Sequence, residues 1–119
     1  MAGNSLTLVG NLVKEPELER TEGGRAVLNF RIAVDEAGGS RGDTGFFTCV
    51  AWGDLAEHLA SSLAKGQRVL VADELRHRTF DVSGEARSVT EIRVTDAGPS
   101  LLWATATVEK RPPVRAAAS

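Results

Sequence analysis

The chain has 119 residues, of which 42% are hydrophobic, which suits one domain of ordinary size and excludes two. A net charge of −2 at pH 7 excludes a protein that holds nucleic acid by bulk positive charge, so any such binding must rest on local patches and stacking. The single cysteine, Cys49, excludes an internal disulfide framework. Its spacing from the two histidines is not that of a metal site, so we expect no metal and no other cofactor.

The first half of the chain predicts three strands. Residues 6–13 read as a strand that is apolar on both faces. The charged residues 15–20 are expected to be a surface connection. The next strand, residues 25–35, alternates most clearly, and its apolar face consists of Ala26, Leu28, Phe30, Ile32 and Val34. A glycine-rich loop then leads to a third strand at residues 46–52.

The second half predicts one helix followed by further strands. Residues 54–63 carry leucines at every fourth position, and Asp54 is placed to cap the first turn of this helix. Residues 67–82 and 87–96 predict a long hairpin around a Ser-Gly-Glu turn. Residues 101–108 predict one more strand.

This order of elements indicates an all-β protein. Five strands with one helix between the third and the fourth are typical of the OB-fold, a Greek-key barrel that binds oligonucleotides or oligosaccharides. The strand at residues 101–108 is then an extra C-terminal one. We place the barrel at residues 1–108 and expect a short, basic, disordered tail at residues 109–119. The fold alone leaves the two classes of ligand open.

The aromatic side chains give the main clue to function. The chain has four phenylalanines and two tryptophans, and three of these rings fall where a strand points them outward. Because alternate side chains of a strand share a face, Phe46 and Trp52 project together. Arg76, Arg78 and Phe80 project together from another strand. Flat rings beside guanidinium groups suit unpaired nucleic acid.

Each of these side chains also has an ordinary structural explanation. The indole of Trp52 could cover the entrance to the helix, and the arginines at 76 and 78 could be solvated edge charges that discourage aggregation. Three further side chains are expected to be structural: Phe47 inside the barrel or at a subunit contact, Cys49 as an inert core thiol, and Trp103 as a packing or interface group.

Several separated motifs agree in order and spacing with one family. They are LVGNL at 8–12 with PE at 16–17, NFRIAV at 29–34, AWGDLAE at 51–57, LAKG at 63–66, GPSL at 98–101 and ATA at 104–106. Together they resemble the bacterial single-stranded DNA-binding protein family, and the last two are similar to its actinobacterial branch. The resemblance covers nearly the whole chain.

The resemblance implies a non-enzymatic OB-fold protein that assembles as a homotetramer. Such a protein wraps single-stranded DNA with little regard to sequence, in DNA replication, recombination and repair. The three outward rings fall on family positions that stack on bases, and the arginines at 76 and 78 fall on basic family positions leading to the last ring. The candidate DNA-binding residues are Phe46, Trp52, Phe80, Arg76, Arg78 and Arg31, the last being outward on its strand.

The sequence departs from the family pattern in three places. Residues 35–38 carry no aromatic side chain where many relatives have a further stacking tryptophan, and Thr48 and Asp54 stand where relatives often have basic residues. The last residues lack the acidic, hydrophobic tip that recruits repair enzymes in the family, so we do not expect such recruitment. The missing ring and the net acidity leave an alternative open, an OB-fold accessory module for protein interaction that binds nucleic acid weakly.

Two further expectations concern chemistry and location. No plausible nucleophile–base pair, phosphate loop or paired acid cluster is present, which argues against an enzyme. No apolar stretch approaches the roughly 20 residues that span a bilayer, and the start does not resemble a signal peptide. We therefore expect a cytoplasmic, nucleoid-associated protein that does not bind membranes.

Overall fold

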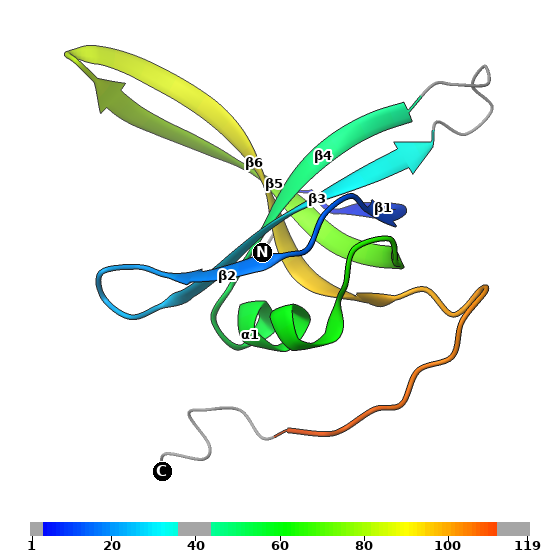
Figure 1. The fold of residues 1–119 in the computed structure, drawn as a ribbon. Helices are drawn as coiled ribbons and strands as arrows, with labels where there is room; N and C mark the ends of the chain where they lie inside the picture. The colour runs from blue at the N-terminus through cyan, green and yellow to red at the C-terminus, as the bar shows by residue number, and fades with distance from the viewer. Residues whose placement is uncertain (1–3, 36–43, 112–119) are drawn as a thin grey trace.

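The computed structural model describes residues 4–35 and 44–111, and Figure 1 shows their arrangement. The elements are, in chain order, β1 (Leu6–Leu12), β2 (Glu17–Arg20), β3 (Ala26–Asp35), β4 (Thr44–Trp52), α1 (Gly53–Ser62), β5 (Arg68–Val82) and β6 (Glu85–Pro99). In these described parts of the chain no helix is long and apolar enough to cross a membrane.

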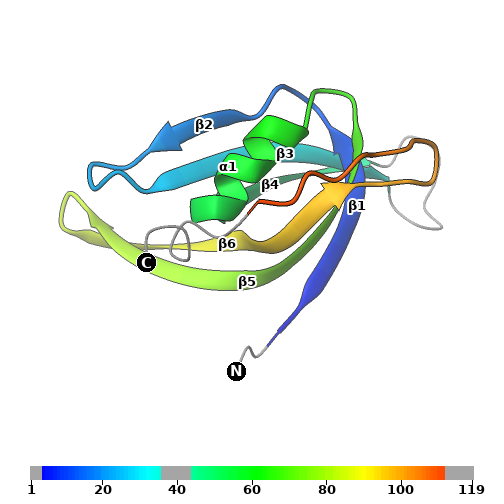
Figure 2. The same cartoon turned by 90° about the horizontal axis from the view of Figure 1, so that it is seen from below.

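The strands form one sheet that closes on itself. Their order along the sheet is β1-β5-β6-β4-β3-β2, and a further pairing between β1 and β3 closes the barrel. The pairing of β4 with β6 is parallel and short, and the other pairings between described strands are antiparallel. Five strands thus make a closed barrel that β2 extends beyond β3, with α1 packed against it (Figure 2). This is the predicted OB-fold.

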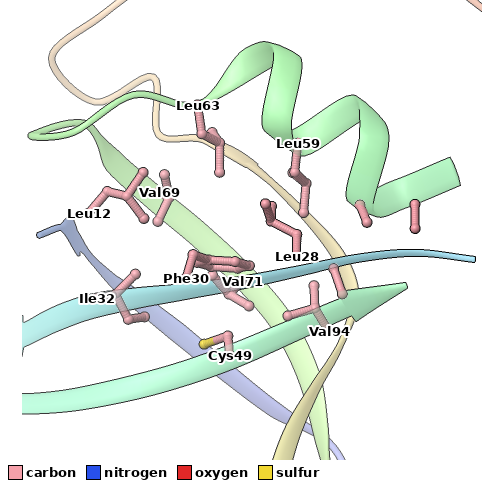
Figure 3. Packing of buried hydrophobic residues seen from close by; sticks show 13 residues of the cluster. Leu12, Leu28, Phe30, Ile32, Cys49, Leu59, Leu63, Val69, Val71 and Val94 are labelled. Carbon is pink, nitrogen blue, oxygen red and sulfur yellow. The ribbon is translucent and has the colours of Figure 1, made fainter. Parts of the chain in front are cut away.

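The barrel interior holds the hydrophobic core, which Figure 3 shows from close by. Strand residues supply Leu12, Leu28, Phe30, Ile32, Cys49, Val69, Val71 and Val94, and the helix region covers them with Leu59 and Leu63. Burying a large apolar side chain of this kind contributes roughly 1.5–3 kcal/mol. In β3 the buried residues recur at every second position, as the sequence predicts. The core therefore also fixes which side chains of these strands point outward.

Two expectations about strands are wrong. Residues 17–20 form β2, which pairs with β3 from Glu17↔Asn29 to Arg20↔Ala26, instead of a surface connection. All four side chains of β2 are exposed, so no apolar alternation marks the strand and only its backbone pairing defines it. Residues 101–108 form no strand and pair with no described strand. The extra strand is therefore β2, and α1 follows the fourth strand in chain order.

The predicted cap of α1 is also wrong. Trp52 is the N-cap residue, in an extended conformation, and its side chain makes no capping hydrogen bond. Asp54 lies within the first turn, where the positive end of the helix dipole favours a carboxylate. Gly53 has a φ of 69°, a left-handed conformation that glycine adopts without strain. This glycine turns the chain from β4 directly into the helix, so Trp52 lies at the junction.

β5 and β6 form a hairpin that extends well past the barrel (Figure 1). At its tip, Ser83 and Gly84 have φ values of 54° and 83°, as both central residues of a type I′ turn require. The first half of β5 alternates between buried and exposed side chains, whereas every side chain from residue 75 to residue 82 is exposed. We call residues 75–91 the outer hairpin.

Asp73 marks the point where β5 leaves the barrel. The register of β5 with β6 shifts between Ala72 and Asp73. The Asp73 carboxylate is buried, and neither of its oxygens has a hydrogen-bond partner among the described residues. Burial raises the pKa of this carboxyl to about 6, because the charged form loses its hydration. Burial, and next to it the charge of Asp73, raises the pKa of the Cys49 thiol to about 12, which makes that thiol unreactive.

Candidate nucleic-acid interface

The three rings that the sequence predicts to point outward all lie outside the core. Phe46 and Trp52 are on β4, where the alternating residues Phe47, Cys49 and Ala51 face the core. The Phe46 ring is 53% exposed and Trp52 is half-buried. On the outer hairpin, Phe80 is 39% exposed. The structure therefore leaves part of each of these three rings open to a ligand.

An arginine lies over each of the two outward-facing rings on β4, Phe46 and Trp52. The guanidinium carbon of Arg25 is 4.6 Å from the centre of the Trp52 ring, and that of Arg31 is 5.1 Å from the centre of the Phe46 ring. Both distances are within the roughly 6 Å over which a cation is attracted to a ring face. The register explains the first pair: Val27 is opposite Trp52, and Arg25 is two residues away on the same face. We call Arg25, Arg31, Phe46 and Trp52 the β3–β4 face.

Phe80 has a similar neighbour, but the charges around it are already paired. The guanidinium carbon of Arg78 is 5.7 Å from the centre of the Phe80 ring. Arg78 Nη2 lies 3.8 Å from Glu91 Oε2 across the hairpin. Arg76 Nη1 lies 2.8 Å from Glu74 Oε1 on the same strand. A phosphate that binds either arginine has to compete with a carboxylate.

Arg25 and Arg31 have no such competitor. Among the residues that the structure describes, no carboxylate oxygen lies within 4.0 Å of either guanidinium. Their charge is open to a phosphate without the loss of an ion pair. The sequence analysis missed Arg25, because its place over the indole depends on the pairing of β3 with β4. The available signal was its outward position at the start of the alternating strand.

An acidic groove borders the β3–β4 face. A hollow of about 210 Å³ is lined by Lys14, Glu15, Glu17, Glu19, Asn29, Phe30, Arg31 and Thr48. Two of its three glutamates stand on β2, the strand that the sequence did not predict. Carboxylates repel phosphates, so a DNA backbone that reaches Arg31 is disfavoured from the β2 side. The groove therefore bounds the cationic surface on one side.

The other positions named in the sequence analysis lie in separate parts of the chain. Two of them lie outside the described residues: residues 36–38, in the loop without an aromatic side chain, and residues 112–119 of the tail. Thr48 is exposed on β4. Trp103 lies in no strand, is 77% exposed, and has the guanidinium carbon of Arg68 4.9 Å from its ring centre. Within the described part of the chain, no three side chains of the metal-binding types gather into a site.

Comparison with known proteins gives one consistent result. A model described as the single-strand binding protein family matches residues 3–99. A single-stranded DNA-binding protein of Mycobacterium leprae is 43% identical in an alignment that covers 92% of this chain and 71% of the relative. The protein of the same description from Mycolicibacterium smegmatis is also 43% identical and is covered to 72%. The one from Corynebacterium glutamicum is 41% identical over 116 residues and is covered to 52%.

Proposed function

Since the chain belongs to the single-strand binding protein family, whose function is to bind single-stranded DNA without catalysis, we propose that the DNA strand lies along the β3–β4 face and continues onto the outer hairpin. The observation that carries this proposal is the pairing of exposed rings with arginines that have no ion pair among the described residues. Phe46, Trp52 and Phe80 stack on bases, and the four arginines Arg25, Arg31, Arg76 and Arg78 contact phosphates.

Stacking supplies most of the affinity. Each base stacked on an aromatic side chain contributes roughly 1–3 kcal/mol, and the contribution tolerates any sequence because every base has a π face. A base stacks on the exposed part of each ring, and the arginine over that ring lies beside it. The arginine also holds a positive charge close to the stacked nucleotide, where the phosphate has to pass.

Phosphate contacts add a smaller, salt-dependent contribution. The logarithm of the affinity for single strands falls with the logarithm of the salt concentration by a slope of about 0.7 for each phosphate contact. Arg25 and Arg31 contribute fully to this slope. Arg76 and Arg78 contribute less, because each exchanges a carboxylate for a phosphate. The DNA affinity of this protein therefore falls less steeply with salt than that of a protein with a strongly basic surface.

Self-association increases the affinity further. We propose a homotetramer, supported by apolar side chains that the single chain leaves exposed after β6: Leu101 is 62%, Leu102 63% and Val108 88% exposed. Joined copies raise the local concentration of binding sites for the same DNA strand. Such an assembly protects single-stranded DNA in replication, recombination and repair, in the cytoplasm at the nucleoid. The mass in solution, with and without an oligonucleotide, tests the number of subunits.

A mutation test addresses the interface directly. Trp52→Ala with Phe80→Ala is expected to weaken binding of oligothymidylate by roughly 2–4 kcal/mol, if Trp52 contributes roughly 1–3 kcal/mol and Phe80 about 1 kcal/mol. Leu18→Ala, which removes a comparably exposed apolar side chain from β2, is the matched control and keeps the affinity. Unchanged affinity in the double variant with an intact fold refutes the interface. Absence of any complex at micromolar protein instead favours the accessory protein-interaction module.

A further inference from the structure

Asp73 places a carboxylate in an otherwise apolar row of side chains. Val69, Val71 and Asp73 point into the barrel at every second position of β5, and both valines are fully buried. Asp73 itself is 3% exposed, and neither of its carboxylate oxygens has a hydrogen-bond partner among the described residues. Removing a carboxyl group from water without a hydrogen bond is unfavourable, and it is far more unfavourable when the group is ionised.

Among the described residues, the groups around Asp73 do not compensate its charge. The opposite residues are Leu6 on β1 and Val94 on β6, which are both apolar. From β4 the Cys49 thiol faces the carboxylate, whose charge contributes to the raised pKa of that thiol. Glu74, the next residue of β5, points to the other face of the strand and is held in an ion pair there. Burial alone raises the pKa of the Asp73 carboxyl to about 6.

The same carboxylate lies where the outer hairpin is attached to the barrel. The register of β5 with β6 shifts beside Asp73, which leaves Thr95 without an opposite residue. Thr95 Oγ1 donates a hydrogen bond to the Ala72 carbonyl oxygen at 3.0 Å. The backbone N–H of Leu75 donates to Asn4 Oδ1 at 2.7 Å, and Asn4 Nδ2 donates to the Leu75 carbonyl oxygen at 3.3 Å. We call these five residues the hairpin root.

The hairpin root is a point at which β5 can move without disrupting the core. From residue 75 to residue 82 the side chains of β5 are exposed on both faces, and the ribbon stands clear of the barrel (Figure 1). Local openings occur where few buried apolar contacts have to be broken. A small displacement of β5 from β1 at the root therefore lets water reach the Asp73 carboxylate while the rest of the barrel stays folded.

We propose that Asp73 is a positioning residue for DNA binding, which keeps the hairpin root closed while its carboxyl is protonated and opens it on ionisation. The closed root holds the outer hairpin in the position from which Phe80 stacks on a base. The open root leaves the hairpin free to move, so that its contribution to binding falls. This inference rests on the proposed function, since it concerns DNA that is bound by the outer hairpin as well as by the β3–β4 face.

The direction of the pH dependence follows from the two environments of the carboxyl. Its pKa is about 6 in the closed root, against about 3.9 for an aspartate in water. Below about pH 4 the carboxyl is protonated in both forms, and the balance between them does not change with pH. As the pH rises the balance shifts toward the open root, by up to about a hundredfold above pH 6.

The effect of Phe80→Ala at two pH values tests this coupling. In the full chain it is expected to weaken binding of oligothymidylate by about tenfold near pH 5 and by about threefold or less near pH 8. Histidine side chains change charge in this range, and His77 lies on the outer hairpin, so both proteins carry His77→Gln. Calorimetric titration measures the two affinities at each pH.

Variants of the hairpin root identify the group responsible. Asp73→Asn is expected to make the loss caused by Phe80→Ala about tenfold at both pH values. Asp96→Asn, which alters an exposed carboxylate beside the same register shift, is the matched control and keeps the pH dependence. Equal losses at the two pH values with Asp73 in place, or a pH dependence that persists in Asp73→Asn, overturn the inference and leave the proposed function intact. No loss at either pH contradicts both.

The reaction of Cys49 with a thiol reagent reports the opening in the absence of DNA. Cys49 is the only cysteine of the chain and is fully buried beside Asp73. Near pH 8, Asp73→Asn is expected to slow this reaction by about tenfold or more, because the root stays closed. Removing the charge would by itself lower the pKa of the thiol and speed the reaction, so an equal or faster rate overturns the inference. A local opening also makes the rate depend only weakly on urea, whereas a steep dependence would mean that global unfolding exposes the thiol and would overturn it too.

Discussion

The β3–β4 face and the outer hairpin both present aromatic rings with arginines over them, but only the strands of the β3–β4 face pack on the hydrophobic core. The strands of the β3–β4 face send alternate side chains, such as Phe30 and Cys49, into the core. The outer hairpin is a two-stranded ribbon whose side chains on β5 are exposed on both faces from residue 75 to residue 82. An unsupported two-stranded hairpin is marginally stable in water. On our proposal we therefore expect DNA to meet an ordered β3–β4 face, and binding to the hairpin to include an entropy cost of ordering it.

The two regions also differ in electrostatics. Arg25 and Arg31 have no ion pair among the described residues, whereas Arg76 and Arg78 are paired with Glu74 and Glu91. The ring–arginine pair is common to both regions, so it does not by itself set the strength of binding. We expect the support below the ring and the charges beside the guanidinium to set this strength, so the β3–β4 face should contribute more than the outer hairpin.

Removing both rings of the β3–β4 face is expected to have the largest effect. Phe46→Ala with Trp52→Ala should lower the affinity for oligothymidylate by roughly 2–6 kcal/mol. Phe80→Ala should lower it by about 1 kcal/mol, because the gain from stacking on the hairpin is offset by the ordering of that segment. Calorimetric titration measures the loss, and circular dichroism checks the fold. A larger loss for Phe80→Ala than for the double variant would reverse the ranking of the two regions.

Asp73, at the boundary between the barrel and the hairpin, is expected to make the stability depend on pH. Its pKa is raised to about 6 in the folded chain, against about 3.9 in an unfolded one. Ionisation therefore favours the unfolded state: below about pH 4 this carboxyl has no effect, and its destabilising contribution grows up to about pH 6 and remains above it.

Replacing this carboxyl tests that dependence. Asp73→Asn should raise the free energy of unfolding by up to about 3 kcal/mol near pH 8, where the folded chain holds the costly buried charge, and by little near pH 4. Urea denaturation at the two pH values measures the difference. Asp81→Asn, on the exposed part of β5, is the matched control. An equal change of stability at both pH values would show that the ionisation of Asp73 is not the cause.

Removing the ion-pair partner of an arginine on the outer hairpin is expected to have the smallest effect on DNA affinity. Glu91→Gln removes the carboxylate 3.8 Å from Arg78 and should strengthen DNA binding by about 0.2–1 kcal/mol, the range of exposed ion pairs. The gain should disappear at high salt, because screening weakens the freed charge. Glu109→Gln, whose partner Arg111 lies in the segment after β6, should change nothing. A gain in affinity that persists at high salt would mean that it does not come from the unpaired charge of Arg78.

The sequence predicted the barrel because its signals are local. Alternation in residues 25–35 and the leucine spacing of the helix both follow from burial of one face, and both appear in the structure. β2 could not be found in this way, because its side chains are all exposed and only pairing with β3 makes it a strand. The strand expected at residues 101–108 has apolar residues but no partner among the described strands.

The outward positions of the candidate site's rings were predictable to the same extent. Strand alternation turned the rings at 46, 52 and 80 outward, and the structure has them partly exposed. The ion pairs of Arg76 and Arg78 and the place of Arg25 over Trp52 depend on which strands become neighbours. Such contacts between residues far apart in the chain leave no periodic signal in the sequence.

The salt dependence of DNA binding tests most directly the claim that the DNA lies along the β3–β4 face. It is to be measured for Arg25→Gln with Arg31→Gln, and for Arg76→Gln with Arg78→Gln, using the same oligothymidylate. The first pair of changes should make the slope of log affinity against log salt shallower by about 1.4, as expected for two lost phosphate contacts, and the second by clearly less. An unchanged slope for the first pair, with the full reduction for the second, would contradict the claim and move the DNA to the outer hairpin.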